Sequence, residues 1–256
     1  MSQALKVFIT GASSGIGLAL AAEYAQRGAI LGLVARRGDA LAEFARRFPH
    51  VSISSYPADV RDAAALAGAA AQFIAQHGLP DIVIANAGVS KGVATGHGDL
   101  EAFREVMDVN YFGMVATFEP FAGPMVEAGH GTLVGIASVA GVRGLPGSAA
   151  YSASKAAALA YLESLRVEMR PKGVAVVTIA PGYIRTPMTA HNPYPMPFLM
   201  DAERFAAKAA RAIARKTRFA VFPWPMRIAA SLLAALPRGL YDRLFEKAPR
   251  KPRASA

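Results

Sequence analysis

The sequence of 256 residues contains no cysteine, which excludes a disulfide framework and any thiolate metal site. The start of the chain lacks the charged, apolar and cleavage regions of a signal peptide, so we expect a cytoplasmic protein. The histidines are scattered without the spacing of metal ligands, so we expect no metal: His50, His77, His97, His130 and His191.

Tryptophan is scarce as well, and basic charge is concentrated at one end. The single tryptophan, Trp224, lies between two prolines, which favours a packed turn over a stacking platform for nucleic acid. Residues 1–200 contain 15 basic and 14 acidic residues, whereas residues 201–256 contain 13 and 4. The net charge of +10 therefore comes almost wholly from the C-terminal end. Nucleic-acid binding through this end ranks last, because no motif or aromatic pattern supports it.

Apolar runs of strand length alternate with helical patterns in residues 1–222. The runs are rich in Val and Ile and lack strict alternation, as expected for parallel strands covered on both faces. They span residues 7–10, 30–35, 51–56, 81–85, 132–137 and 174–180, with 219–222 as a candidate seventh. Helical patterns span residues 15–28, 38–48, 61–77, 99–127 and 151–170, with glycines 28, 78 and 173 as stop signals. We predict one α/β domain over residues 1–222, built on a doubly wound parallel sheet with helices on both faces.

A glycine-rich turn follows the first predicted strand. Residues 10–17 have the spacing G-x-x-x-G-x-G and lead directly into a helix. Glycines allow close backbone approach, and the helix N-terminus presents free N–H groups to a pyrophosphate. Packing alone would also explain such glycines, but the strand before and the helix after favour a phosphate cradle.

The second predicted strand ends in Arg36 and Arg37, where a protein selective for NAD commonly has an acidic residue. Two guanidinium groups there would bind a 2'-phosphate through charge-assisted hydrogen bonds. The alternative is a solvated turn before the next helix. Asp39 lies further on, at the helix start, where a carboxylate has an ordinary dipole role.

Tyr151 and Lys155 are four residues apart in a helical pattern and so share one helix face. A fixed cation beside the phenol would lower the pKa of Tyr151 and make it a usable general acid or base. An exposed, solvated pair has the same spacing, so the pair alone does not decide between the two.

The ordered set of motifs closely resembles the short-chain dehydrogenase/reductase family. The resemblance runs from about residue 5 to residue 187. It rests on residues 10–17, Asn86-Ala87-Gly88, Asn110, Ser138, Tyr151, Lys155, Pro181-Gly182 and Thr186. It implies a Rossmann-like fold of about seven strands and an NADP(H)-dependent oxidoreductase, with NAD(H) less favoured. A non-catalytic dinucleotide sensor or interaction protein on the same fold is the alternative.

The resemblance also assigns roles. Ser138 would donate to a substrate carbonyl and Tyr151 would transfer the proton, while Lys155 would lower the tyrosine pKa and bind the nicotinamide ribose. Asn110 would hold a water that links Lys155 to solvent. Cofactor contacts are expected from Gly11, Ser13, Ser14, Gly15, Ile16, Gly17, Arg36, Arg37, Asp59, Val60, Asn86, Ala87, Gly88, Tyr151, Lys155, Pro181, Gly182, Ile184 and Thr186. Asp59 has a second interpretation as a helix cap.

We expect the substrate to be recognised by a proline-rich loop over about residues 186–205, which contains several Met and aromatic residues. Such a loop suits a lid over an apolar substrate. Met188 would lie on this lid, and Val139, Arg143 and Leu145 would form the opposite wall. We expect a medium-sized apolar ketone or secondary alcohol as substrate.

Residues 223–256 form a basic amphipathic extension. Apolar clusters within residues 232–245 lie opposite the charged residues Arg238, Asp242, Arg243 and Lys247, and Pro237 divides two short helices. The run 228–236 is too short to span a bilayer. Peripheral membrane contact at the inner face is one interpretation. The others are that these helices cap the substrate pocket or form the interface of a homodimer or homotetramer.

Overall fold

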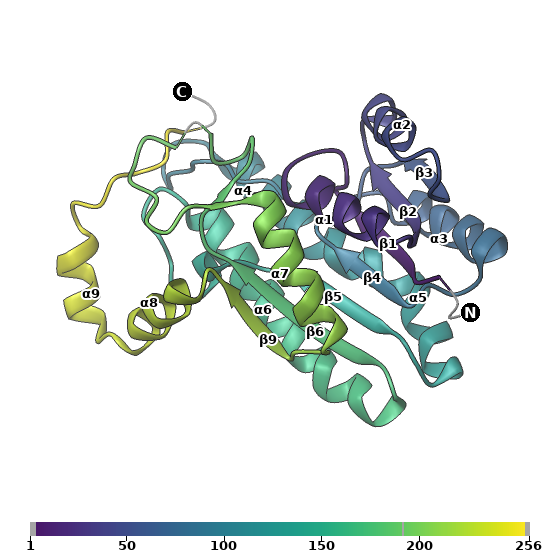
Figure 1. Ribbon diagram of the computed structural model, residues 1–256. Helices are drawn as coiled ribbons and strands as arrows, with labels where there is room; N and C mark the ends of the chain where they lie inside the picture. Colours follow the sequence, from purple (N-terminus) through teal and green to yellow (C-terminus); the bar gives the residue numbers. More distant parts are fainter. Residues whose placement is uncertain (1–3, 191, 254–256) are drawn as a thin grey trace.

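The computed structural model describes residues 4–190 and 192–253. Its centre is a sheet of seven parallel strands in the order β3-β2-β1-β4-β5-β6-β9 (Figure 1). The strands are β1 (Lys6–Thr10), β2 (Ile30–Ala35), β3 (Ile53–Pro57), β4 (Ile82–Ala85), β5 (Thr132–Ile136), β6 (Ala175–Pro181) and β9 (Phe219–Phe222). The predicted doubly wound sheet of about seven strands is therefore confirmed.

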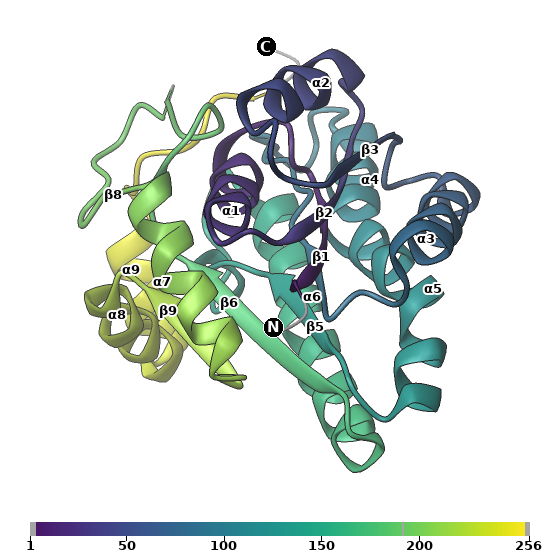
Figure 2. The ribbon, with the colours of Figure 1, turned by 45° about the vertical axis from the view of Figure 1, so that its right-hand side comes forward.

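Helices cover both faces of the sheet, as Figure 2 shows. They are α1 (Gly15–Gln26), α2 (Gly38–Arg47), α3 (Ala63–His77), α4 (Leu100–Met107), α5 (Gly113–Ala128), α6 (Ala149–Met169), α7 (Ala202–Ala214), α8 (Trp224–Ala235) and α9 (Arg238–Phe245). In β1, Val7 and Ile9 pack under α1, α2 and α7, whereas Phe8 packs under α3, α5 and α6. The five inner strands thus bury both faces, which explains their nearly continuous apolar sequences, whereas the edge strands β3 and β9 are partly exposed.

The strand order reverses direction between β1 and β4. Loops that leave neighbouring strands on either side of this point separate and leave a crevice at the carboxyl ends. The register places Thr10 beside Val34 of β2 and Ile9 beside Ile84 of β4. The glycine-rich turn after β1 and the Asn86 segment after β4 are therefore brought together.

The prediction of one helix over residues 99–127 was wrong in detail. The segment divides into α4, a π-helical turn η1 (Asp108–Phe112) and α5, with Asn110 inside the π turn. The loop predicted over residues 186–205 also contains regular structure. The strand β8 (Met200–Asp201) lies within it and pairs in parallel with β7 (Ile184–Arg185), which lies just before it, and α7 begins at Ala202 and packs along α1.

The C-terminal extension forms α8 and α9, which lie at the left-hand end of the molecule in Figure 1. Pro237 separates the two helices, as predicted. After α9 the chain runs back towards the loops at the carboxyl ends of the strands, where Arg253 makes an isolated parallel bridge with Gly92. Across residues 4–190 and 192–253, no helix combines the length and apolar character needed to cross a membrane.

Candidate active site

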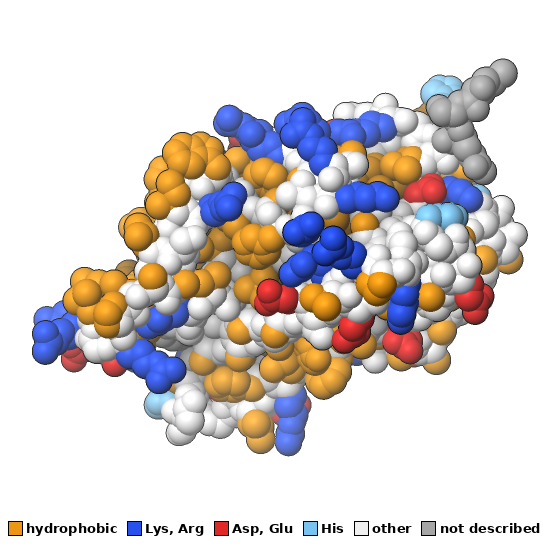
Figure 3. All heavy atoms as spheres, turned by 90° about the horizontal axis from the view of Figure 1, so that it is seen from below, with side chains coloured by type: hydrophobic (Ala, Val, Ile, Leu, Met, Phe, Trp, Pro, Cys, Tyr) orange, Lys and Arg blue, Asp and Glu red, His pale blue; other side chains and the backbone are white. Residues whose placement is uncertain are grey.

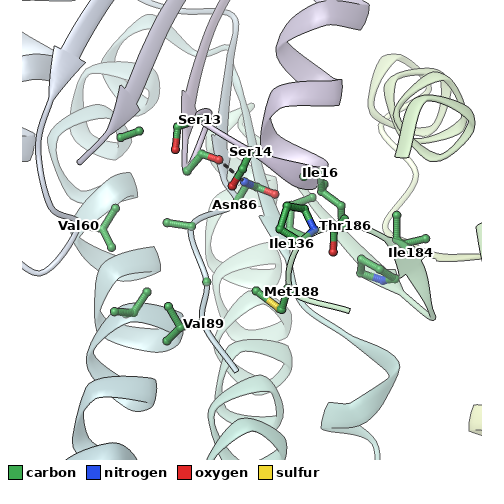
Figure 4. A pocket seen from close by; sticks show the side chains of 18 of the residues that line it. Ser13, Ser14, Ile16, Val60, Asn86, Val89, Ile136, Ile184, Thr186 and Met188 are labelled. Carbon is green, nitrogen blue, oxygen red and sulfur yellow. Dashed lines mark hydrogen bonds between the residues drawn. The ribbon is translucent and has the colours of Figure 1, made fainter. Parts of the chain in front are cut away.

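A cavity of about 350 Å³ lies in the crevice at the carboxyl ends of the strands (Figure 4). It brings together most of the predicted residues, although they come from six separate loops and from α6. Its predicted lining residues are Gly11, Ser13, Ser14, Gly15, Ile16, Arg36, Arg37, Asp59, Val60, Asn86, Ala87, Gly88, Ser138, Tyr151, Lys155, Pro181, Gly182, Ile184, Thr186 and Met188.

The glycine-rich turn fits closely against the segment after β4. Gly11 has a φ of +69°, and a Cβ there would lie 2.7 Å from the Cα of Ala87. A Cβ on Gly17 would lie 2.2 Å from the carbonyl oxygen of Gly11. The amide Nδ2 of Asn86 donates to the carbonyl oxygens of Thr10 and Gly11, at 3.0 and 3.2 Å. Gly17 is therefore a packing residue behind the turn rather than part of the cavity wall.

The N-terminus of α1 faces the cavity. Ser14 occupies the N-cap position, but its side chain makes no capping hydrogen bond to the helix. Figure 4 shows Ser13 and Ser14 beside Asn86 at the same side of the pocket. Unused helix N–H groups and a serine hydroxyl thus point to one place, an arrangement suited to a phosphate.

Two exposed arginines follow β2 at the far end of the cavity. The Nη2 of Arg37 donates to the carbonyl oxygen and the Oγ of Ser13, at 3.2 and 3.3 Å, which holds the guanidinium beside the glycine turn. Across the rim, Asp59 accepts three side-chain hydrogen bonds from Arg61, which lower the pKa of its carboxyl. Asp59 therefore stays charged, and Arg36 lies close enough to lower its pKa further.

Ser138, Tyr151 and Lys155 meet at the opposite end of the cavity. Ser138 follows β5 and caps the 3₁₀ turn η2 (Val139–Gly141), accepting from the N–H of Ala140 at 3.1 Å. Tyr151 lies in the first turn of α6, and Lys155 lies one turn later. The Nζ of Lys155, 3% exposed, donates to the carbonyl oxygen of Ile136 at 2.8 Å and lies 5.9 Å from the centre of the Tyr151 ring.

The pKa of Tyr151 is raised, not lowered as the sequence analysis expected. Burial is the largest cause, and the hydrogen bond with Ser138 offsets only part of it. Burial also lowers the pKa of Lys155 to about 8. Both groups therefore favour their neutral forms more than they do in water, because little solvent reaches them.

Asn110 is fully buried, and its amide joins three parts of the site. Its Oδ1 accepts from the N–H of Val89 at 2.8 Å, and its Nδ2 donates to the carbonyl oxygen of Val89 and to the Oγ of Ser154, both at 2.9 Å. The hydroxyl of Ser154 donates in turn to the carbonyl oxygen of Tyr151. Asn110 thus lies behind the cavity wall and fixes the loop after β4 to α6.

Sequence reasoning missed Ser154 and Thr189. Ser154 is a polar residue on the buried side of α6, between Tyr151 and Lys155, and this position was a usable signal. The hydroxyl of Thr189 donates to the carbonyl oxygen of Ile184 at 2.7 Å and accepts from the N–H of Thr186 at 3.1 Å. It therefore ties down the loop after β6 that lines the cavity.

Of the predicted substrate residues, the structure brings only Met188 to the cavity. Val139 packs instead against a small cluster that contains Met226 of α8. The guanidinium of Arg143 donates to the carbonyl oxygen of Leu236 at 3.1 Å and stacks over Tyr241, so it holds the extension. Leu145 lies on the same loop, where its N–H donates to the Oγ of Ser152 at 3.2 Å. These three residues support the wall from behind.

Comparison with known proteins agrees with this geometry. The family model described as short chain dehydrogenase matches residues 5–195. An uncharacterized oxidoreductase of Myxococcus xanthus is 37% identical over 236 residues, which cover 91% of this chain and 93% of that protein. A solved short chain dehydrogenase of Burkholderia cenocepacia, in complex with NADP, is 27% identical with a TM-score of 0.82 and covers 96% of this chain and 99% of its own. Another, from Mycobacterium paratuberculosis and bound to NAD, is 26% identical with a TM-score of 0.77, covering 85% and 95%. On these matches and on the seven-stranded fold, the chain belongs to the short chain dehydrogenase family of oxidoreductases.

Proposed function

We propose that this protein is an NADP(H)-dependent oxidoreductase that interconverts a carbonyl and a secondary alcohol. The observation that carries the proposal is the meeting of Ser138, Tyr151 and Lys155 at one end of a cleft whose other end is lined by the glycine-rich turn and the start of α1. The solved relatives that bind NADP and NAD support a nicotinamide dinucleotide as the cofactor. A sensor without catalysis would have no need of all three side chains.

The residues present fit such a cofactor. Gly11 and Gly17 leave no room for a side chain at the turn, and the free end of α1 faces the cavity. The bound cofactor would supply the hydride that the carbonyl carbon accepts. Ser138 would donate a hydrogen bond to the carbonyl oxygen, and Tyr151 would give that oxygen its proton. In the reverse direction, Tyr151 would take the proton from the alcohol.

Lys155 would stabilise the tyrosinate that remains after proton transfer to the product. Its ammonium is on the same face of α6 and inside the same low-polarity pocket, where a charge interacts more strongly than in water. Asn110 would hold the loop after β4 in place beside Lys155. We propose this holding role for Asn110, because its amide is used by Val89 and Ser154.

The preference for NADP(H) over NAD(H) rests on Arg36 and Arg37. Both are exposed at the end of β2, where the ribose of the adenosine half would lie, and Arg37 is held towards the cavity by Ser13. A guanidinium pairs well with a 2'-phosphate, and its loss should cost about 1.5–3 kcal/mol of binding.

The first experiment is a screen of NADPH oxidation with ketones, aldehydes and ketoacyl thioesters, repeated with NADH. We expect turnover with apolar ketones and a clear preference for NADPH. Arg37→Ala should lose affinity for NADPH but not for NADH, whereas Arg46→Ala, at the exposed end of α2, should change neither. Activity only with small charged hydroxy acids would refute the apolar substrate, and a strong preference for NADH would refute the arginine argument.

An apolar substrate is supported by the residues that cover the end of the cavity near Tyr151. Met188 lines the cavity directly, and Tyr194 of the substrate loop forms an aromatic pair with Tyr183, which follows β6, with ring centres 6.5 Å apart. Both tyrosines have a raised pKa because of burial, so their hydroxyls stay neutral. Methionine and aromatic side chains offer a cover that adapts to apolar shapes.

A second role is favoured for the extension by one exposed stripe. Trp224, Ile228 and Leu232 lie four residues apart on α8 and are 70%, 52% and 66% exposed. Leu240 and Leu244 of α9 are exposed as well. Figure 3 shows hydrophobic and basic side chains adjoining at the end of the molecule formed by these helices. We propose that this surface makes peripheral contact with an anionic membrane.

Flotation with vesicles tests this contact in the full chain. Binding should require anionic lipid and should fall when Trp224 and Leu232 are both replaced by serine; phosphatidylcholine vesicles and a Phe112→Ser variant, exposed elsewhere, serve as controls. The alternative is that this surface forms the interface of a homodimer or homotetramer. If the double variant leaves flotation unchanged, or if it lowers only the molecular mass in light scattering, membrane contact is refuted.

A further inference from the structure

After α9 the chain returns to the active-site loops and is fastened there by two cations. The Nζ of Lys251 donates to the carbonyl oxygen and the Oγ of Ser90, at 3.0 and 2.9 Å. The guanidinium of Arg253 donates to both carboxylate oxygens of Asp99, at 2.8 and 2.9 Å, and to the carbonyl oxygen of His97. In Figure 1 this segment rises from α9 towards α4.

The ion pair of Arg253 and Asp99 is not an ordinary surface pair. The side chain of Asp99 is 1% exposed, and its Oδ2 also accepts from the N–H of Ala94 at 2.8 Å. The carboxylate therefore joins the C-terminal segment and the loop after β4 in one small network. The Arg253 side chain is 31% exposed, so the pair is half-buried, and its bidentate geometry with the buried carboxylate should make it stronger than an exposed pair.

Two glycines in other loops pack directly against this C-terminal segment. A Cβ on Gly92 would lie 1.9 Å from the carbonyl oxygen of Pro252. A Cβ on Gly147, which has a φ of +75°, would lie 2.8 Å from the Cβ of Arg250. At Gly92 the obstacle is backbone, so a side chain there would displace the segment. The close packing of the segment therefore depends on a glycine in each of two other loops.

The loop that the segment holds is the one that touches the reacting end of the cavity. Gly88 lies against Asn110 and Lys155, since a Cβ there would be 3.3 Å from Oδ1 and 3.7 Å from Nζ. Further along, Val93 packs in one cluster with Tyr151, and its N–H donates to the carbonyl oxygen of Gly147 at 3.2 Å. Movement of residues 90–99 would therefore change the packing around the side chain of Tyr151.

The same extension also grips the loop after β5, which begins at Ser138. Arg143 binds the carbonyl oxygen of Leu236 and stacks over Tyr241, and the hydroxyl of Tyr241 donates to the carbonyl oxygen of Gly144. The cofactor cradle at Gly11 and Arg37 is on the other side of the cleft. The extension thus braces the substrate side of the site, and not the cofactor side.

We propose that residues 250–253 are an intramolecular clamp, in which Lys251 and Arg253 act as positioning residues that hold the loop after β4 and so shape the substrate side of the site. The clamp rests on the carbonyl reduction proposed above. Tyr151 and Lys155 are also held independently, by α6 and by the contacts of Ser154 and Ile136. The clamp should therefore affect the recognition of substrate more than the chemical step.

The test compares Arg253→Ala, Arg253→Lys and Gly92→Ala in the full chain, with the carbonyl substrate found in the screen. Arg253→Ala should raise KM by about tenfold, change kcat by less than about threefold and leave the Kd of NADPH unchanged. Arg253→Lys should recover part of the loss, because it keeps the charge. Gly92→Ala should reproduce the raised KM without removing any charge.

Gly144→Ala is the matched control, because among residues 4–190 and 192–253 no atom beyond its own chain neighbours lies within 4 Å of its added Cβ. Arg238→Ala, on the exposed part of α9, controls for the loss of one cation. Neither should change KM. If Arg253→Ala and Gly92→Ala lower kcat and the NADPH-binding stoichiometry but not KM, the segment has only a stabilising role and the proposal is wrong.

Hydrogen exchange gives a readout that does not depend on turnover. Amides of residues 88–99 should exchange faster in Arg253→Ala and Gly92→Ala than in the parent chain, while those of α1 stay unchanged. If the parent chain reduces no carbonyl, the proposed function fails, yet this measurement still tests the clamp. Unchanged exchange in residues 88–99 would overturn it.

Discussion

The side of the cleft formed by the turn after β1 is held by close backbone packing and the short amide of Asn86, whereas the opposite side is held by long side chains. At the first side, Gly11 packs on the backbone of Ala87, and Asn86 bonds the carbonyl oxygens of the turn. At the second side, Arg143 and Lys251 reach across from separate elements to bind carbonyl oxygens. Close backbone packing tolerates few substitutions in sequence, whereas contacts made by side chains can be replaced by other side chains. The difference suits a fixed cofactor and a substrate site that varies within one fold.

The largest effect should follow from Tyr151→Phe, which removes the proposed proton donor but keeps the contacts that hold the two sides of the cleft. We expect turnover to fall by about 10²–10⁴-fold, because the carbonyl oxygen loses its proton donor. The Kd of NADPH should stay nearly the same, since the ring and the cradle remain. Steady-state rates and fluorescence titration with NADPH measure the two quantities.

Tyr161→Phe is the control for this substitution, because Tyr161 lies on the same helix but does not line the cavity. Burial raises the pKa of Tyr161 to about 12. The Tyr161→Phe variant should retain full turnover. If Tyr151→Phe keeps more than about a tenth of the parent rate, another group supplies the proton and the assignment is wrong.

The next largest effect should come from Gly17→Ala, which tests the backbone-held side. The added Cβ would lie 2.2 Å from the carbonyl oxygen of Gly11, so the turn or α1 must shift. We expect a loss of about 1–3 kcal/mol in unfolding free energy, as for overpacked sites, together with weaker NADPH binding. Chemical denaturation and NADPH titration measure both.

Gly68→Ala provides the opposite expectation from the same chemical change. Gly68 lies inside α3, and apart from the backbone of its own helix, no atom of the described residues lies within 4 Å of its added Cβ. Alanine there should stabilise the protein by about 0.5–1 kcal/mol and leave NADPH binding unchanged. If the two variants behave alike, close packing at the turn is not what sets the need for Gly17.

The strands and the cofactor side were predictable because their signals are local. A buried parallel strand shows as an apolar run, and the turn after β1 shows as glycines with fixed spacing. The π-helical turn around Asn110 had no such signal, because a π turn differs from an α-helix only in the register of its hydrogen bonds. The helix α7 did leave an amphipathic pattern at residues 202–214, but no helix was predicted there, and the predicted loop over residues 186–205 includes its first turn.

The substrate side could not be predicted in the same way. Arg143 was expected to face the cavity, yet its partners at Leu236 and Tyr241 lie more than 90 residues further along the chain. Spacing carries no information about such contacts. The pKa of Tyr151 had the same difficulty, because its direction depends on how deeply the folded chain buries the phenol relative to the pull of Lys155.

The pH dependence should distinguish Lys155 from Tyr151. The pKa of Lys155 is about 8, so its ammonium is lost as pH rises through this value, while the raised pKa of Tyr151 keeps the phenol protonated. We expect kcat/KM for reduction to be level below pH 8 and to fall about tenfold for each pH unit above it. A profile measured from pH 6 to 10 checks this.

Lys155→Arg sharpens that test, because a guanidinium stays charged throughout this range. Whatever its rate, the variant should lack the decline that begins near pH 8. The stability of the parent chain should change in the opposite sense. Between pH 8 and the ordinary lysine value of 10.5, the unfolded chain binds more protons at this residue, so folding becomes more favourable as pH rises. A decline that persists in the variant would assign it to another group.

The smallest effect should follow from Arg143→Ala, which loosens the side-chain-held half at one point. The guanidinium contributes one good hydrogen bond, to Leu236, and a cation–π contact with Tyr241 at 4.5 Å. Because the site is partly exposed, we expect a loss of only about 1 kcal/mol. Limited trypsin digestion should cut near Arg238 and Arg243 sooner, since α8 and α9 then leave the loop after β5 more often. Arg143→Lys should not restore the parent pattern, because an ammonium cannot stack as a planar guanidinium does. Unchanged digestion would mean that the apolar contacts of α8, and not Arg143, hold the extension.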